Sequence, residues 1–484
     1  GNANVQGQSV TLDWPRVFRR PIAFALETCK VEAAWQKKSW WQLDVHRCRM
    51  ENEDLAVVGR VRLEADEGKP EVDINVAMLR GDVSRFGDYW PENVMKPSTL
   101  RWLRTSLLDG QVSGGRYSMV GDMDDFPFKD QNGSLLAVAP VREANLRYAD
   151  GWPHAHQVDA LAFFEGPGMH VEGTVGNSAG AAVDYVSVRI DDFKAPVLDL
   201  DYRATTDLPQ LVEFLKSTPL LDGLDLDLQK FVLEGPSEIT GHLSTGLGQT
   251  EQPLQVHGAL LMLGDRFTEL TSGVVLDDIE GTLHYHKEGL EAMDLHAAYK
   301  GFPVGLEVVS DWDADEVFRA SLHGSLPFRQ VVPADLLERE PLFGRASGDS
   351  LWDIGVSVVR PEGVEDRETW LDIYSGLKGV DIDLPAPLGK PADLEWPVLV
   401  RYPIRAREHV LSADLPGQLQ LKMELSRTDS TPTRAVVQFG GKVKSLPGHG
   451  QFVIDGSADE FDLDSWIDLT VERFSEKSDV GGLT

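Results

Sequence analysis

Strict alternation of apolar and polar residues runs through most of this chain and constrains its fold more than any other feature. Every second residue is apolar in three clear stretches: Leu419, Leu421, Met423 and Leu425; Met293, Leu295, Ala297 and Tyr299; and Val380, Ile382 and Leu384. Successive side chains of a β-strand point to opposite faces, so these segments predict strands with one apolar and one wet face. Such strands usually belong to antiparallel sheets.

Three short segments, 98–108, 207–217 and 333–339, have helical spacing instead. In the clearest one, Leu208, Leu211, Val212 and Leu215 lie at i, i+3, i+4 and i+7. These segments resemble one another, because Trp102-Leu103 recurs as Phe214-Leu215 and again as Leu336-Leu337. We therefore predict modules of roughly 110–125 residues, each an array of strands closed by a short helix. The expected boundaries are 1–110, 111–223, 224–345 and 346–484, with the last module truncated.

The charge balance is strongly acidic, with 78 acidic and 46 basic residues and a formal net charge of −32. Such a surface repels nucleic acid and anionic membrane faces. The acidic residues alternate with apolar ones and form no blocks, which favours carboxylates spread over the wet faces of strands.

No run of about 20 apolar residues exists, so we expect no membrane-spanning helix. The first residues lack the basic-then-apolar pattern of a signal peptide, and Gly1-Asn2-Ala3 resembles a cloning scar. We expect the chain to be a piece of a longer protein. Two cysteines, Cys29 and Cys48, either pair in an oxidising compartment or remain as buried thiols.

Two serine motifs suggest a hydrolase but lack the required context. Residues 176–180 fit G-x-S-x-G around Ser178, yet a strand-like alternation follows where that motif needs a helix. Residues 348–351 spell Gly-Asp-Ser-Leu around Ser350, yet neither His409 nor His449 has an aspartate three residues before it. We predict no catalytic residue.

Candidate metal ligands are equally incomplete. Residues 311–315 begin like a calcium loop, but Glu316 and Leu322 replace its glycine and its final glutamate. His154 with His156, and His284 with His286, place two imidazoles on one strand face without a third ligand. There is no phosphate-binding loop and no dinucleotide fingerprint. We therefore predict no cofactor and no metal.

Several ordered stretches resemble the large AsmA-like bacterial envelope proteins of the YhdP type. They begin with residues 89–95 and 100–103, and continue with 107–116, 121–128 and 145–153. They end with residues 377–380, 383–391 and 460–466. Their order matches that of the family from about residue 85 to residue 466.

The resemblance implies a non-enzymatic periplasmic segment of a bridge-like protein that carries phospholipid between the inner and outer membranes of a Gram-negative bacterium. It implies an inner-membrane anchor through an N-terminal helix that is missing here. Its expected partners are the acyl chains of phospholipids and, in addition, outer-membrane or periplasmic proteins.

A sheet with one apolar face must cover that face, and curling into a trough is one way to do so. We therefore predict a mainly β fold, with a long curled antiparallel sheet that forms an open, repeating groove. The candidate groove residues come from the three alternating stretches: Leu419, Leu421, Met423, Leu425, Val380, Ile382, Leu384, Met293 and Leu295. The competing prediction is a structural or interaction scaffold of closed β-sandwiches without a lipid groove. A hydrolase that uses Ser178 or Ser350 is a third alternative.

Overall fold

The computed structural model describes most of the chain. The described residues are 2–5, 7–13, 15, 18–27, 29–36, 40–66, 69–90, 92, 95–130, 132–221, 228–361, 366–428 and 430–469. The chain divides into two compact units, an N-terminal unit (Gly1–Leu261) and a C-terminal unit (Met262–Thr484). The predicted four-module division remains a proposal, and its boundary at 223/224 lies outside the described residues.

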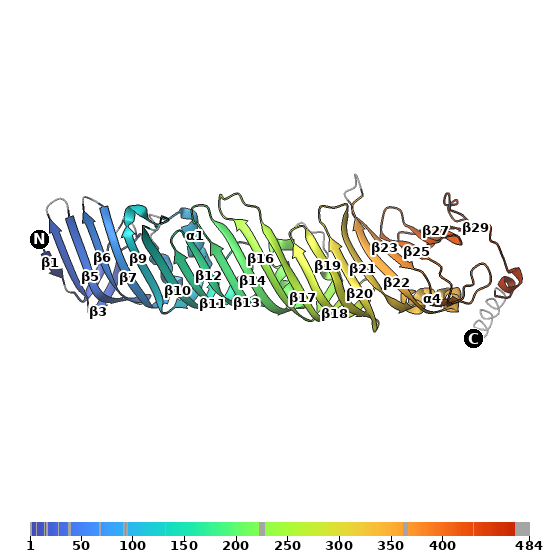
Figure 1. The fold of residues 1–484 in the computed structure, drawn as a ribbon, viewed down its shortest axis with the longest axis horizontal. Coiled ribbons are helices and arrows are strands. Elements are labelled where there is room, and N and C mark those ends of the chain that lie inside the picture. Colours follow the sequence, from blue (N-terminus) through green and yellow to red (C-terminus); the bar gives the residue numbers. More distant parts are fainter. Residues whose placement is uncertain are drawn as a thin grey trace. The chain divides into compact units, whose positions relative to one another are not determined.

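Strands dominate the N-terminal unit (Figure 1). The strands within it are β1 (Asn2–Val5), β2 (Ser9–Leu12), β3 (Ile22–Glu27), β4 (Lys30–Gln36), β5 (Trp40–Glu51), β6 (Leu55–Asp66), β7 (Lys69–Asp82), β8 (Leu107–Val112), β9 (Gly115–Asp122), β10 (Gly133–Leu146), β11 (Ala155–Glu165), β12 (Gly168–Ser178), β13 (Ala181–Ile190), β14 (Val197–Asp207), β15 (Phe231–Glu234) and β16 (Pro236–Gly246). From β4 to β14 they pair antiparallel in nearly sequential order.

The C-terminal unit continues the same pattern. The unit boundary falls within β17 (Gln255–Glu269). The remaining strands are β18 (Val274–His286), β19 (Gly289–Tyr299), β20 (Phe302–Ser310), β21 (Glu316–Pro327), β22 (Ala346–Val359), β23 (Glu368–Ser375), β24 (Val380–Ile382), β25 (Val398–Arg405), β26 (Val410–Leu415), β27 (Leu419–Leu425), β28 (Pro432–Phe439) and β29 (Phe452–Gly456). The mainly β prediction is confirmed, with one difference: β29 pairs parallel to β28, so the sheet is mixed.

Short helices interrupt the strands close to where helical spacing predicts them. They are α1 (Pro97–Ser106), α2 (Leu208–Lys216), α3 (Phe328–Val331) and α4 (Ala334–Arg339). The 3₁₀ turns are η1 (Val83–Asp88), η2 (Met123–Asp125), η3 (Pro219–Leu221), η4 (Leu228–Lys230) and η5 (Pro341–Arg345). A proline at the first or second position starts both α1 and α2, where its missing N–H costs no intrahelical hydrogen bond. No helix of the described part is long and apolar enough to cross a membrane.

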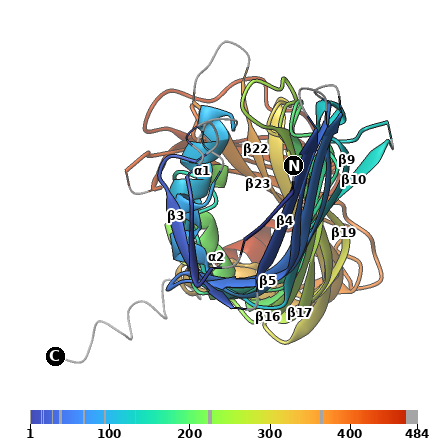
Figure 2. The ribbon, with the colours of Figure 1, turned by 90° about the vertical axis from the view of Figure 1, so that its left-hand side faces the viewer.

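The sheet of the N-terminal unit bends at irregular points in its ladders. The register shifts between Val45 and Cys48 of β5, and between Val141 and Ala144 of β10. An unpaired residue in one strand kinks that strand and increases its twist. The end-on view accordingly shows β5 as a curved ribbon (Figure 2).

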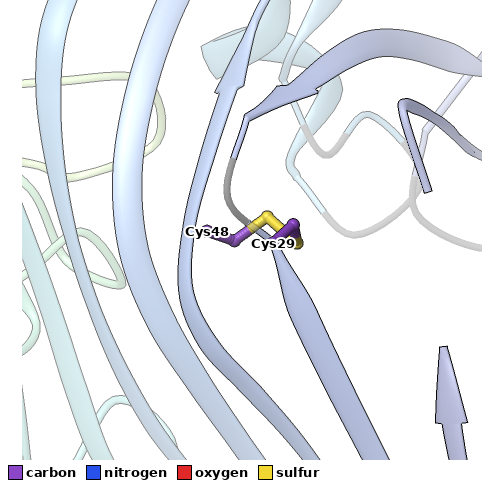
Figure 3. Close-up of a disulfide and its surroundings, with 2 residues drawn as sticks. All are labelled: Cys29 and Cys48. Atoms are coloured by element: carbon purple, nitrogen blue, oxygen red, sulfur yellow. A yellow bond between two sulfur atoms is a disulfide. The ribbon is translucent and has the colours of Figure 1, made fainter. Parts of the chain in front are cut away.

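A disulfide joins Cys29 and Cys48 at one of these bends (Figure 3). It lies where β5 changes partner, from β4 at Lys30–His46 to β3 at Glu27–Arg49. Of the two alternatives for the cysteines, the structure has the paired one. Among the described residues, Ile22, Phe24 and Leu55 form one small buried cluster.

Candidate functional site

One line of apolar side chains crosses ten strands of the C-terminal unit. Each member lies directly opposite the next one in the ladder. Residues directly opposite in a ladder share a face. We call this set the C-terminal apolar row: Leu295, Leu306, Leu322, Ile354, Ile373, Val400, Ala413, Leu421, Val437 and Ile454.

The row is only partly covered by the rest of the protein. Leu295 is 4 % exposed, the seven residues from Leu322 to Val437 are half-buried, and Ile454 is 77 % exposed. A core side chain packed between two layers would be buried throughout. Leu306, like Leu295, is buried (9 % exposed), so this face keeps apolar surface available from Leu322 to Ile454.

The predicted groove residues of β27 belong to this face. Leu421 is a member of the row, whereas Met423 lies between Leu411 and Ala435 in the neighbouring line. Leu419 is half-buried as well, but Leu425 at the strand end is only 6 % exposed.

The other predicted stretches are placed differently. Val380 is fully buried in β24, opposite Gly348, and Ile382 pairs with Ala346 at the beginning of β22. Leu384 follows β24 and is half-buried. These three residues therefore do not lie in the C-terminal apolar row.

The alternation predicted for β19 is wrong at Met293. Ala292 pairs with Val308 and Leu295 pairs with Leu306, so β19 carries one extra residue in between. This bulge brings Ala292 and Leu295 to the same face and leaves Met293 55 % exposed. Strict alternation places Met293 and Leu295 on one face, which the observed register does not allow.

The N-terminal unit carries comparable lines of apolar residues. The first crosses β4 to β10 and comprises Val31, Val45, Val61, Ile74, Met119 and Leu135. The second crosses β10 to β16 and comprises Ala139, Ala162, Val171, Val188, Leu200 and Leu243. All but Met119 and Ala162 are half-buried. We call these two sets the N-terminal apolar rows.

Phe128 covers the first of these rows at one point. Its side chain, 5 % exposed, packs with Val72 and Met119. Gly121 and Gly133 lie opposite each other beneath it, and a Cβ on Gly133 would come within 2.4 Å of the phenylalanine ring. Two facing glycines thus make room for an aromatic ring on the apolar face, a contact that alternation does not reveal.

In the N-terminal unit, helix α1 is attached at both of its ends, to points that lie at opposite ends of the strands. At its beginning, Lys96 Nζ donates to the carbonyl oxygen of Phe193, in the loop between β13 and β14. At its end, the Arg147 N–H donates to the Ser106 carbonyl at 2.9 Å, beside the end of β10. The ladders place these two points at opposite ends of the strands. The end-on view shows α1 across from β9 and β10 (Figure 2).

The opposite face of the sheet is charged. Arginines pair there with aspartates on adjacent strands, as in Arg62–Asp44 and Arg142–Asp159. The N–H of Glu143 and the Arg142 guanidinium lower the pKa of the Asp159 carboxyl. Much of the acidic excess is therefore solvated on this face.

In the part of the chain that the structure describes, no hydrogen bond joins Ser178 or Ser350 to a histidine. Residues 176–180 span the hairpin turn between β12 and β13, as their glycines predict. Ser350 lies within β22, and its Oγ accepts a hydrogen bond from Ser375 Oγ at 3.1 Å. Asp311 caps a turn by accepting the N–H of Asp313. The described ranges contain no group of three or more His, Cys, Asp or Glu side chains that could hold a metal ion.

Comparison with known proteins gives one consistent result. The family model described as "YhdP protein" matches residues 1–482. The intermembrane phospholipid transporter YhdP of Escherichia coli (strain K12) is 22 % identical over 385 residues, which cover 79 % of this chain and 30 % of that protein. The chain thus spans less than a third of that relative's length. No solved structure matches.

Proposed function

Since the chain belongs to the YhdP family, we propose that its apolar rows hold the acyl chains of phospholipids in a segment of a protein that transports lipid between membranes. The observation that carries this proposal is the C-terminal apolar row, in which ten directly opposed side chains remain largely half-buried. The relative described as an intermembrane phospholipid transporter supports the same class of ligand.

The energetics suit a conduit better than a tight binding site. Each buried methylene contributes about 0.8 kcal/mol, so an acyl chain gains from contact with any stretch of such a row. Neighbouring residues of a row are all apolar. An acyl chain can therefore shift from one strand to the next, about 4.8 Å away, with little change in binding free energy. No polar pocket and no catalytic group are needed, and we propose a non-enzymatic role.

We place this segment in the periplasm of a Gram-negative envelope, as part of a protein anchored in the inner membrane. The Cys29–Cys48 disulfide supports an oxidising compartment, because such bonds are rare where glutathione keeps thiols reduced. Phospholipid acyl chains are the proposed ligands, and outer-membrane or periplasmic proteins are the proposed further partners.

Adjacent residues of β28 offer a sharp test. Val437 belongs to the C-terminal apolar row, and Gln438 faces the other way, opposite Gln420. A photocrosslinking amino acid at 437 should capture phospholipid in cells, with adducts identified by mass spectrometry. The same group at 438 should capture little. Equal capture at both positions, or none at 437, would contradict the proposal and favour a scaffold without a lipid groove.

A further inference from the structure

The charged face of the C-terminal unit contains a hollow of about 410 Å³, and no residue of the apolar rows lines it. A volume of this size fits a small ligand. The lining residues come from five strands and their connections: Val359, Pro361, Glu368, Trp370, Arg401, Glu408, Val410, Ser412 and Lys422. Ser412 and Lys422 lie next to Ala413 and Leu421 in sequence, so they point to the face opposite the C-terminal apolar row.

Three side chains that can donate hydrogen bonds lie side by side at one end of this hollow. Arg401 lies directly opposite Ser412, and Ser412 lies directly opposite Lys422. Three strands thus present a guanidinium, a hydroxyl and an ammonium in a single rung. Strand spacing places the outer two backbones about 9.6 Å apart, so an anion above Ser412 is within reach of all three side chains.

The two cations of this rung retain hydrogen-bonding capacity. The Arg401 guanidinium stacks on the Trp370 ring at 4.5 Å from the centroid, and its Nε lies 3.6 Å from Asp372. Its terminal nitrogens keep the fork geometry that suits a carboxylate. Among the described residues, no carboxylate lies within ion-pair distance of Lys422. An oxyanion would therefore complete this end.

Carboxylates mark the other end. Glu368 lies four residues before Asp372 on β23, and Glu408 lies four residues before Ser412. Along β23 these four extended residues span about 13 Å, whereas Glu408 lies in the bend before β26. Glu368 accepts the N–H of Arg407, and Glu408 is exposed. The apolar surfaces of Trp370 and Val410 separate this acidic end from the donor rung.

We propose that this hollow binds a zwitterionic chain of about tripeptide length. Its carboxylate contacts Arg401, Ser412 and Lys422, and its body lies over Trp370. Its ammonium group faces Glu368 and Glu408. Three extended residues span about 10 Å, which fits within the roughly 13 Å that separates the two charged ends along β23. This inference does not depend on lipid binding, because the site occupies the other face of the sheet.

Three peptides separate the two charged contacts by calorimetry at low ionic strength. Trialanine should bind the whole chain with saturable heat. Trialanine amide, which lacks the carboxylate, and N-acetyl-trialanine, which lacks the ammonium, should each bind at least about tenfold more weakly, since a charge-assisted hydrogen bond contributes roughly 1.5–3 kcal/mol.

Two variants test which end of the peptide each charged side chain contacts. Lys422→Gln should weaken trialanine about tenfold but leave the amide unchanged, and Glu408→Gln should weaken trialanine but leave the acetylated peptide unchanged. Lys442→Gln, an exposed lysine outside the hollow, is the matched control. Absence of saturable trialanine binding, equal binding of all three peptides, or indifference to Lys422→Gln would each overturn the proposal.

Discussion

Lys96 Nζ lies 3.2 Å from the carbonyl oxygen of Phe193, although 97 positions separate the two residues in sequence. The contact ties the beginning of α1 to the loop between β13 and β14. Because the Arg147 N–H after β10 donates to the Ser106 carbonyl at the end of α1, the helix is held at both of its ends, across the length of the strands.

Loss of the Lys96 contact should loosen α1 without unfolding the N-terminal unit. In Lys96→Ala, we expect backbone amides of α1 to exchange with deuterium several-fold faster, because an exposed hydrogen bond contributes about 0.5–1.5 kcal/mol. Exchange in β11 and β12 should not change. Lys378→Ala, an exposed lysine of the other unit, is the control. Unchanged protection of α1 would show that this contact does not hold the helix.

The facing glycines beneath Phe128 predict a sharp steric effect. A Cβ at position 133 would lie 2.6 Å from the Val120 carbonyl oxygen and 2.4 Å from the Phe128 ring. Gly133→Ala should therefore displace the ring and destabilise the N-terminal unit by about 1–3 kcal/mol in urea unfolding. Gly87→Ala, where no atom lies within 4 Å of the added Cβ, should change stability little. Similar values for both variants would contradict this packing.

Reduction of the disulfide should lower stability where β5 changes partner. Cys29 and Cys48 are 19 positions apart, and closing a loop of about that length stabilises a fold by roughly 3 kcal/mol in the chain-entropy model. The Cys29→Ala/Cys48→Ala variant should lose about this much in urea unfolding, and reductant should then have no further effect on it. A reductant-sensitive variant would point to another origin of the effect.

Alternation in the sequence predicts which face of a strand is apolar but not which strands are neighbours. Alternation predicts Leu421 as a groove residue, yet its place between Ala413 and Val437 follows only from the observed ladder. Val380 shows the same limit, because its strand pairs with the beginning of β22 and is buried there. Periodicity carries no information on such non-local pairing.

Bulges and loop contacts account for other differences. A single extra residue in β19 is enough to expose Met293, because the side-chain period is two. Phe128 lies in a connection, where an aromatic residue has no periodic context, although Gly121 and Gly133 leave space for its ring. The Arg401–Ser412–Lys422 rung joins three strands and is equally invisible in any local pattern.

The Glu269 carboxyl makes the stability of the C-terminal unit depend on pH in the acid range. Burial alone would raise the pKa of its carboxyl, but hydrogen bonds from Ser272 and Thr271 outweigh burial and lower the pKa to about 2. Because the folded pKa is depressed below 4.5, this contribution is fully present above that pH and is lost as the pH falls toward 2. Glu269→Gln should flatten the pH dependence of urea unfolding in this window. A parallel pH profile would contradict the assignment.

Charge placed in the C-terminal apolar row should block lipid without unfolding the sheet. An aspartate at Leu421 or Val437 would put an ionised group where an acyl chain is proposed to lie, and burying an unpaired charge costs several kcal/mol. Because both positions are half-buried, the aspartate can be hydrated when no lipid is present, and the circular dichroism spectrum should not change. A photocrosslinking amino acid at Val437, directly opposite position 421, should capture at least about tenfold less phospholipid in Leu421→Asp than in the unchanged chain. Gln438→Asp, on the opposite face of β28, should retain the wild-type amount. Equal retention in all variants would mean that the bound lipid lies elsewhere.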